Sequence, residues 1–122
     1  MNKILMLAAL AEAGTGMILL ADPRIVVQLL FGAEVVGAGI IMSRLAGIAL
    51  IGLGAACWPG TGTRLAFQGM VTYSTLAMLY LIWIGVRGES AGFLLWPTVV
   101  VHAILVVLLF RARFKEEKTP PV

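Results

Sequence analysis

Four long apolar runs, joined by short polar connections, constrain the fold of this chain more than any other feature. The runs cover about 4–21, 35–58, 65–86 and 91–110. A helix rises 1.5 Å per residue, so about 20 apolar residues are enough to cross the hydrocarbon core of a bilayer. The sequence therefore predicts an all-α fold, a four-helix transmembrane bundle formed by residues 1–110.

The composition agrees with that prediction. Hydrophobic residues make up 61% of the 122 residues and charged residues only 12%, which is outside the usual range of soluble domains. The net charge of +3 comes from basic residues beside the ends of the apolar runs, where they suit anionic lipid headgroups better than nucleic acid. We expect a multi-pass protein of the inner (plasma) membrane, with the lipid bilayer as a partner and no nucleic acid.

Turn signals and charged stretches separate the runs. Pro23 ends the first run, the segment 59–62 (PGTG) the second and the segment 87–90 (RGES) the third. The apolar segment 24–31 is too short to span, and it is either an interfacial turn of helix or an early start of the second helix. Residues 111–122 are charged and contain two prolines, which indicates a cytoplasmic tail.

The distribution of basic residues predicts the orientation. The side that holds both termini carries six of them, namely Lys3, Arg64, Arg111, Arg113, Lys115 and Lys118. The other side carries Arg24 and Arg87. Because cytoplasmic loops are enriched in Lys and Arg, both termini are expected to be cytoplasmic. Three tryptophans lie near predicted helix ends and are expected to act as interfacial anchors: Trp58, Trp83 and Trp96.

Small residues recur every fourth position in the second run, at Gly39, Ser43 and Gly47. Ala9 and Ala13 form a shorter equivalent in the first run. Such stripes allow two helix backbones to approach closely in a membrane. We predict a tight helix contact there, inside the bundle in preference to a contact with another subunit.

Polar residues occupy the middle of all four runs. They are Glu12, Arg44, the trio Tyr73, Ser74 and Thr75, and His102. Counted along the predicted helices, each lies near the bilayer centre, where ionisable groups are costly and usually have a partner or a function. Glu12 and Arg44 are predicted to form an ion pair.

This polar layer has three interpretations. The first is structural: the Glu12 and Arg44 pair fixes how the helices assemble. The second is a proton or solute site, in which Glu12 and His102 exchange protons. The third uses His102 as an axial haem ligand or quinone partner. No metal site or catalytic motif is predicted, since the lone Cys57 has no metal-ligand spacing and no nucleophile is paired with a base.

Two resemblances bear on these interpretations. The length, the four helices and Glu12 in the first helix resemble the small multidrug resistance transporters, which implies that this carboxylate exchanges protons for cationic drugs. The chain is also similar over most of its length to a group of short bacterial membrane proteins with no assigned function. The matching features are Glu12-Ala13, Gly16, Pro23, 29–32 (LLFG), 44–47 (RLAG), 57–59 (CWP), Trp96-Pro97 and His102. That second resemblance implies a fold but no activity.

We therefore expect a non-enzymatic membrane protein that acts through helix contacts, as a homo-oligomer or as an accessory subunit of a membrane complex. A small proton-coupled transporter is the alternative. A haem- or quinone-associated subunit is a second alternative, although no cofactor is expected in the leading interpretation.

Overall fold

Helices are the only regular secondary structure in the part that the computed structural model describes, which is residues 2–60, 62–88 and 90–119. Its five helices are α1 (Asn2–Ala21), α2 (Pro23–Phe31), α3 (Ala38–Ala56), α4 (Thr63–Arg87) and α5 (Leu95–Lys118). All except α2 are long and apolar enough to cross a membrane. The predicted all-α fold with four candidate membrane spans is thus confirmed, with one additional short helix.

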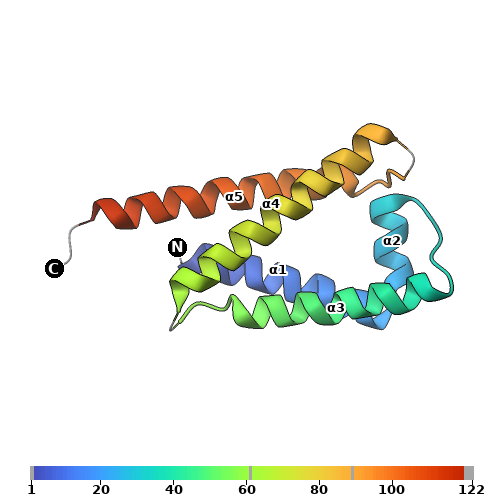
Figure 1. The fold of residues 1–122 in the computed structure, drawn as a ribbon, viewed down its shortest axis with the longest axis horizontal. Coiled ribbons are helices and arrows are strands. Elements are labelled where there is room, and N and C mark those ends of the chain that lie inside the picture. The colour runs from blue at the N-terminus through green and yellow to red at the C-terminus, as the bar shows by residue number, and fades with distance from the viewer. Residues whose placement is uncertain (1, 61, 89, 120–122) are drawn as a thin grey trace.

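The four long helices form two antiparallel pairs. As Figure 1 shows, α1 lies against α3 and α4 crosses beside α5, so successive long helices alternate in direction. The start of α1 and the end of α5 lie at the same end of the bundle (Figure 1). Helix α1 packs chiefly on α3 and touches α4 and α5 only lightly. The boundary between the two pairs is therefore the looser part of the bundle.

Helix α2 resolves the open question about residues 24–31. The side chain of Asp22 caps its first turn by accepting a hydrogen bond from the Arg24 backbone N–H at 3.2 Å, and Pro23 occupies the first helical position. Gly32 ends it in the left-handed conformation with φ of 61°. Helix α2 lies across the end of the bundle (Figure 1). It is a separate helix, and α3 begins at Ala38, not at 35, after the turn at Gly37 with φ of 55°.

The C-terminal end of α2 is fastened to the segment that precedes α5. The backbone N–H of Gly92 donates to the carbonyl of Leu30, and that of Leu94 donates to the carbonyl of Leu29, both at 2.8 Å. A side chain on Gly92 would collide with the Leu29 carbonyl. We call these two hydrogen bonds the α2–α5 clasp, and they join the two helix pairs at one end of the bundle.

Helix α5 starts and ends later than predicted. The sequence placed residues 111–122 in a tail, yet the helix continues to Lys118 and projects beyond the start of α1 (Figure 1). Good helix formers and the Arg113–Glu117 ion pair, with 3.0 Å between Nε and Oε1, support this extension. Residues 120–122 of the predicted tail lie outside the described residues.

The buried interior contains two apolar clusters with polar residues between them. One cluster lies towards the chain termini and contains Leu5, Ala8, Cys57, Ala66, Phe67, Met70 and Leu109. The other lies towards α2 and contains Leu81, Leu95 and Val99. Between the two clusters along α1, α4 and α5 lie the buried polar residues Glu12, Ser74 and His102. The interior is therefore interrupted by a polar layer at mid-height.

Candidate functional site

Three helices from both pairs bring Glu12, Tyr73 and His102 together. Tyr73 on α4 and His102 on α5 make an edge-to-face ring contact, with centroids 5.9 Å apart and an interplanar angle of 73°. The Tyr73 side chain lies close to the Glu12 side chain on α1. Together with the adjacent Ser74, these residues form what we call the polar cluster. The prediction that Glu12, Tyr73, Ser74 and His102 share a depth agrees with this geometry.

The polar cluster is buried and only partly satisfied. Glu12 is 6% exposed, His102 7% and Ser74 0%. His102 Nδ1 and Ser74 Oγ have no hydrogen-bond partner within the described ranges. A buried polar atom without a partner typically costs about 1–3 kcal/mol, so these two atoms leave hydrogen-bonding capacity inside the bundle.

Glu12 occupies the centre of its helix. It is ten residues from Asn2 and nine from Ala21, or roughly 14–15 Å from either end of α1 at 1.5 Å per residue. That position corresponds to the middle of a hydrocarbon core about 30 Å thick. The cluster is therefore equally remote from both ends of this span.

The structure contradicts the predicted ion pair between Glu12 and Arg44. Arg44 is exposed on the outside of α3, and it forms no ion pair or hydrogen bond with any described side chain. The close contacts of α1 and α3 explain why: Gly47 lies opposite Gly16, and Gly54 lies opposite Ala9. In this antiparallel register Arg44 is level with the last turn of α1.

The same register separates Arg44 from Glu12 along the helix axis by at least about seven residues, or roughly 10 Å. The depth of Arg44 was predicted by counting from the start of the second helix. That count was wrong because, along the common axis, α3 begins past the point where α1 ends. The segment that connects α2 with α3 produces this offset. Thr75, the last residue of the predicted trio, is half-buried and donates no side-chain hydrogen bond within the described part of the chain.

The small-residue contact differs in part from the predicted stripe. A Cβ atom added to Gly47 would lie 2.6 Å from the Gly16 carbonyl oxygen, and one added to Gly54 would lie 2.6 Å from that of Ala9. Gly47 thus lies at the closest approach of α3 to α1, inside the bundle. Gly39, however, faces only the side chain of Val35, its own neighbour in the chain.

Ser43, the remaining member of the stripe, is half-buried one turn before Gly47. The contact therefore continues from Gly47 to Gly54, away from Ser43 and Gly39. The sequence signal that identifies this direction is a seven-residue glycine spacing that matches Ala9, Ala13 and Gly16 on α1.

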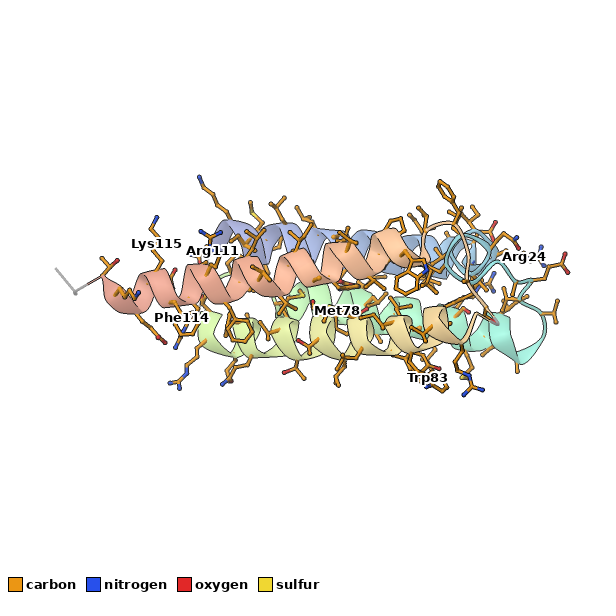
Figure 2. The ribbon with its side chains drawn as sticks, turned by 90° about the horizontal axis from the view of Figure 1, so that it is seen from above. Arg24, Met78, Trp83, Arg111, Phe114 and Lys115 are labelled. Atoms are coloured by element: carbon orange, nitrogen blue, oxygen red, sulfur yellow. The ribbon has the colours of Figure 1, made fainter. Side chains whose placement is uncertain are left out.

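The three tryptophans are about half exposed, at 50% for Trp58, 53% for Trp83 and 46% for Trp96. The Arg87 guanidinium carbon lies 5.0 Å from the centre of the Trp83 ring, a cation–π contact. Figure 2 shows Trp83 near the end of α4, towards the end of the molecule that carries Arg24. Their role as interfacial anchors stays a prediction.

The chain is an all-helical protein with four candidate membrane spans that enclose a polar cluster. No family model, no curated protein and no solved structure matches it. The resemblance to short bacterial membrane proteins and to small multidrug resistance transporters therefore stays a prediction. No three His, Cys, Asp or Glu residues of the described chain stand close enough together to hold a metal ion.

Proposed function

We propose that this chain is a non-enzymatic integral membrane protein whose polar cluster binds and releases a proton during transport across the bilayer. The observation that carries this proposal is the position of Glu12, buried at the centre of α1 with no basic partner in the described structure. A carboxylate in such surroundings is costly to keep charged, so a proton or a cation has to accompany it.

The neighbours of Glu12 suit proton exchange. The Tyr73 side chain lies beside the carboxyl group and its ring contacts His102, so one residue neighbours both groups that could exchange protons. His102 Nδ1 is unoccupied by any described hydrogen bond and is available to a proton or a solute. The cluster also lies on the looser boundary between the helix pairs, where movement of one pair would change its surroundings.

We further propose that the protein lies in the inner (plasma) membrane with both termini cytoplasmic. The end of the bundle that holds the termini carries Lys3, Arg64, Arg111, Arg113, Lys115 and Lys118. The opposite end carries Arg24, Arg87 and, by the helix register, Arg44. This asymmetry supports the orientation expected from the positive-inside rule.

The test compares the parent with Glu12→Gln in liposomes that contain a pH-sensitive dye. A potassium diffusion potential drives protons inward, and we expect the parent to acidify the lumen and Glu12→Gln to remain at the rate of protein-free liposomes. Glu34→Gln is the matched control, since Glu34 is an exposed carboxylate in the segment between α2 and α3. Equal rates for the parent and Glu12→Gln would reject the proposal.

A second measurement does not depend on knowing the solute. Infrared difference spectra between pH 5 and pH 8 should show a protonated-carboxyl band in the parent that Glu12→Gln lacks and Glu34→Gln retains. We also expect Glu12→Gln to unfold within about 1 kcal/mol of the parent, because no buried cation is left without its partner. A loss of about 3–5 kcal/mol would instead indicate a structural ion pair.

A function through helix contacts, as a homo-oligomer or accessory subunit, is the second candidate. Helix α3 is the least buried of the four long helices, and Ile41, Met42, Leu45 and Ile48 are exposed around Arg44. The test introduces Ile48→Cys into a Cys57→Ala background and measures disulfide-linked dimers in vesicles. Leu76→Cys on α4, where Leu76 is 61% exposed, is the control. Equal cross-linking of the two variants would argue against a specific α3 contact.

The haem or quinone alternative depends on His102. This side chain is 7% exposed and covered on one side by Tyr73, so a porphyrin would bind only after the helices part. A Soret band in the purified protein would support haem, whereas its absence after supplementation with haem during expression would exclude it.

A further inference from the structure

A groove runs between the beginning of α1 and the end of α5, at the end of the bundle that holds the termini. It is lined by three apolar residues, Ile4, Leu108 and Ala112, and by the polar residues Arg111, Lys115, Glu116 and Thr119. Along α5 the apolar Leu108 comes first, and the charged residues follow towards the C-terminal end of the helix. The groove therefore changes from apolar to basic in the outward direction.

Arg111 and Lys115 are one helical turn apart and project from the same side of α5. Figure 2 shows both side chains on the side of α1, with Phe114 on the opposite side. Both are exposed, and neither forms an ion pair with a described residue. Glu116 also lines the groove, so the formal charge of its lining is +1. The two cations are close enough together to contact one anion.

The neighbouring Arg113 shows a different arrangement. Its Nε donates to Glu117 Oε1 at 3.0 Å, and its guanidinium carbon lies 5.8 Å from the centre of the Phe67 ring on α4. Arg113 is thus engaged inside the protein and holds the extended part of α5 near α4. Arg111 and Lys115 have no comparable contacts within the described residues and remain available to an external anion.

We propose that this groove binds an anionic phospholipid of the adjacent leaflet, with its phosphate on Arg111 and Lys115 and an acyl chain along Ile4 and Leu108. The guanidinium group donates two parallel hydrogen bonds to phosphate oxygens, and the ammonium group adds a point charge. The apolar part of the groove faces the hydrocarbon core, where an acyl chain lies. This site is separate from the polar cluster and does not depend on the proposed transport function.

The experiment titrates the full chain, purified in a neutral detergent, with phosphatidylglycerol and counts bound lipids by native mass spectrometry. Each basic residue near a lipid headgroup contributes about fivefold in affinity, so Arg111→Gln combined with Lys115→Gln should bind about 30-fold more weakly than the parent. Arg111→Lys, which keeps the charge, should retain most of the binding. Circular dichroism of each variant confirms that the helices are intact.

Arg64→Gln combined with Lys118→Gln is the matched control. Both residues are exposed near the same end of the bundle and lie outside the groove. Replacing them removes two positive charges, as the test variant does. We expect this control to bind phosphatidylglycerol nearly as tightly as the parent, and phosphatidylcholine to bind weakly to every variant. Equal losses in the two double variants would overturn the proposal, as would equal binding of phosphatidylcholine. Equally strong displacement by inorganic phosphate would reassign the groove to a free anion.

Discussion

The two helix pairs are held together in different ways. In the α1–α3 pair the backbones themselves meet, because Gly16 and Gly47 each have the other's carbonyl oxygen where a Cβ would lie. In the α4–α5 pair large side chains fill the contact, among them Phe67 and Phe110, whose rings meet edge to face at 5.7 Å. In lipid, packing and hydrogen bonding drive helix association because the surroundings are as apolar as the helices. A contact between two backbones cannot adjust without moving a helix, whereas a contact between side chains can adjust by changing their rotamers.

The largest effect is expected from adding a methyl group inside the α1–α3 contact. In Gly47→Ala the new Cβ would lie 2.6 Å from the Gly16 carbonyl oxygen and 3.0 Å from Leu19 Cβ, so the two helices have to separate. We expect a loss of about 2–3 kcal/mol in the free energy of unfolding, the upper part of the range for overpacking. Reversible unfolding in mixed detergent micelles measures it. A loss below about 0.5 kcal/mol would show that the backbone contact adjusts easily.

The next largest effect is expected from breaking the α2–α5 clasp, because the clasp joins the two helix pairs. Gly92→Ala places a Cβ against the Leu29 carbonyl and the backbone of Leu30, and it should break both clasp hydrogen bonds. Two ordinary hydrogen bonds contribute about 1–2 kcal/mol together. Hydrogen exchange followed by mass spectrometry should show faster exchange in 23–37 and 90–95, with α1 and α3 unchanged. Faster exchange throughout α1 instead would indicate that α2 stabilises the whole bundle.

A methyl group inside the α4–α5 contact should be tolerated better. A Cβ on Gly85 would lie 2.7 Å from Trp96 Cζ2 and 2.9 Å from Leu95 Cδ2, both of which are side-chain atoms. Because these side chains can change rotamer, Gly85→Ala should cost less than about 1.5 kcal/mol and should alter the Trp96 fluorescence maximum. The measurement uses a protein that also carries Trp58→Phe and Trp83→Phe, so that Trp96 is the tryptophan that remains. If Gly85→Ala costs as much as Gly47→Ala, the distinction between the two pairs fails.

The smallest effect is expected at a glycine of α3 outside the contact. Gly52 is exposed, and an added Cβ would have no atom within 4 Å. Gly52→Ala should therefore change the free energy of unfolding by at most about 1 kcal/mol, in the stabilising direction, because alanine restricts the unfolded chain. The same unfolding assay checks it. Destabilisation here would mean that α3 has a further close neighbour, such as a second copy of the chain.

Much of the polar cluster was predictable from residue type and from position along each helix. Glu12, Ser74 and His102 interrupt apolar runs near their middles, and burial of all three follows because lipid is a poor solvent for them. Arg44 met the same criterion and yet lies outside the bundle. Position in a run measures distance from a helix end, while contact also depends on where that end lies relative to the neighbouring helix.

The glycine contact shows the same limit in another form. A spacing of four made Gly39, Ser43 and Gly47 the natural stripe, but only Gly47 lies where the two backbones meet. Gly54 and Gly16 complete the contact, and their seven-residue spacings from Gly47 and Ala9 gain meaning only when the two helices are paired. The partner helix determines which small residues lie at the closest approach.

The sequence by itself determined the all-helical fold, the four candidate spans and the polar residues at their centres, because these depend on hydrophobicity and helix length along one chain. Only the tertiary structure decided which polar residues meet. The offset between α1 and α3 moves Arg44 at least about 10 Å along the axis from Glu12, and the approach of α4 and α5 places Tyr73 and His102 there instead. Axial register between helices arises from packing of specific side chains and backbones, which no single helix encodes.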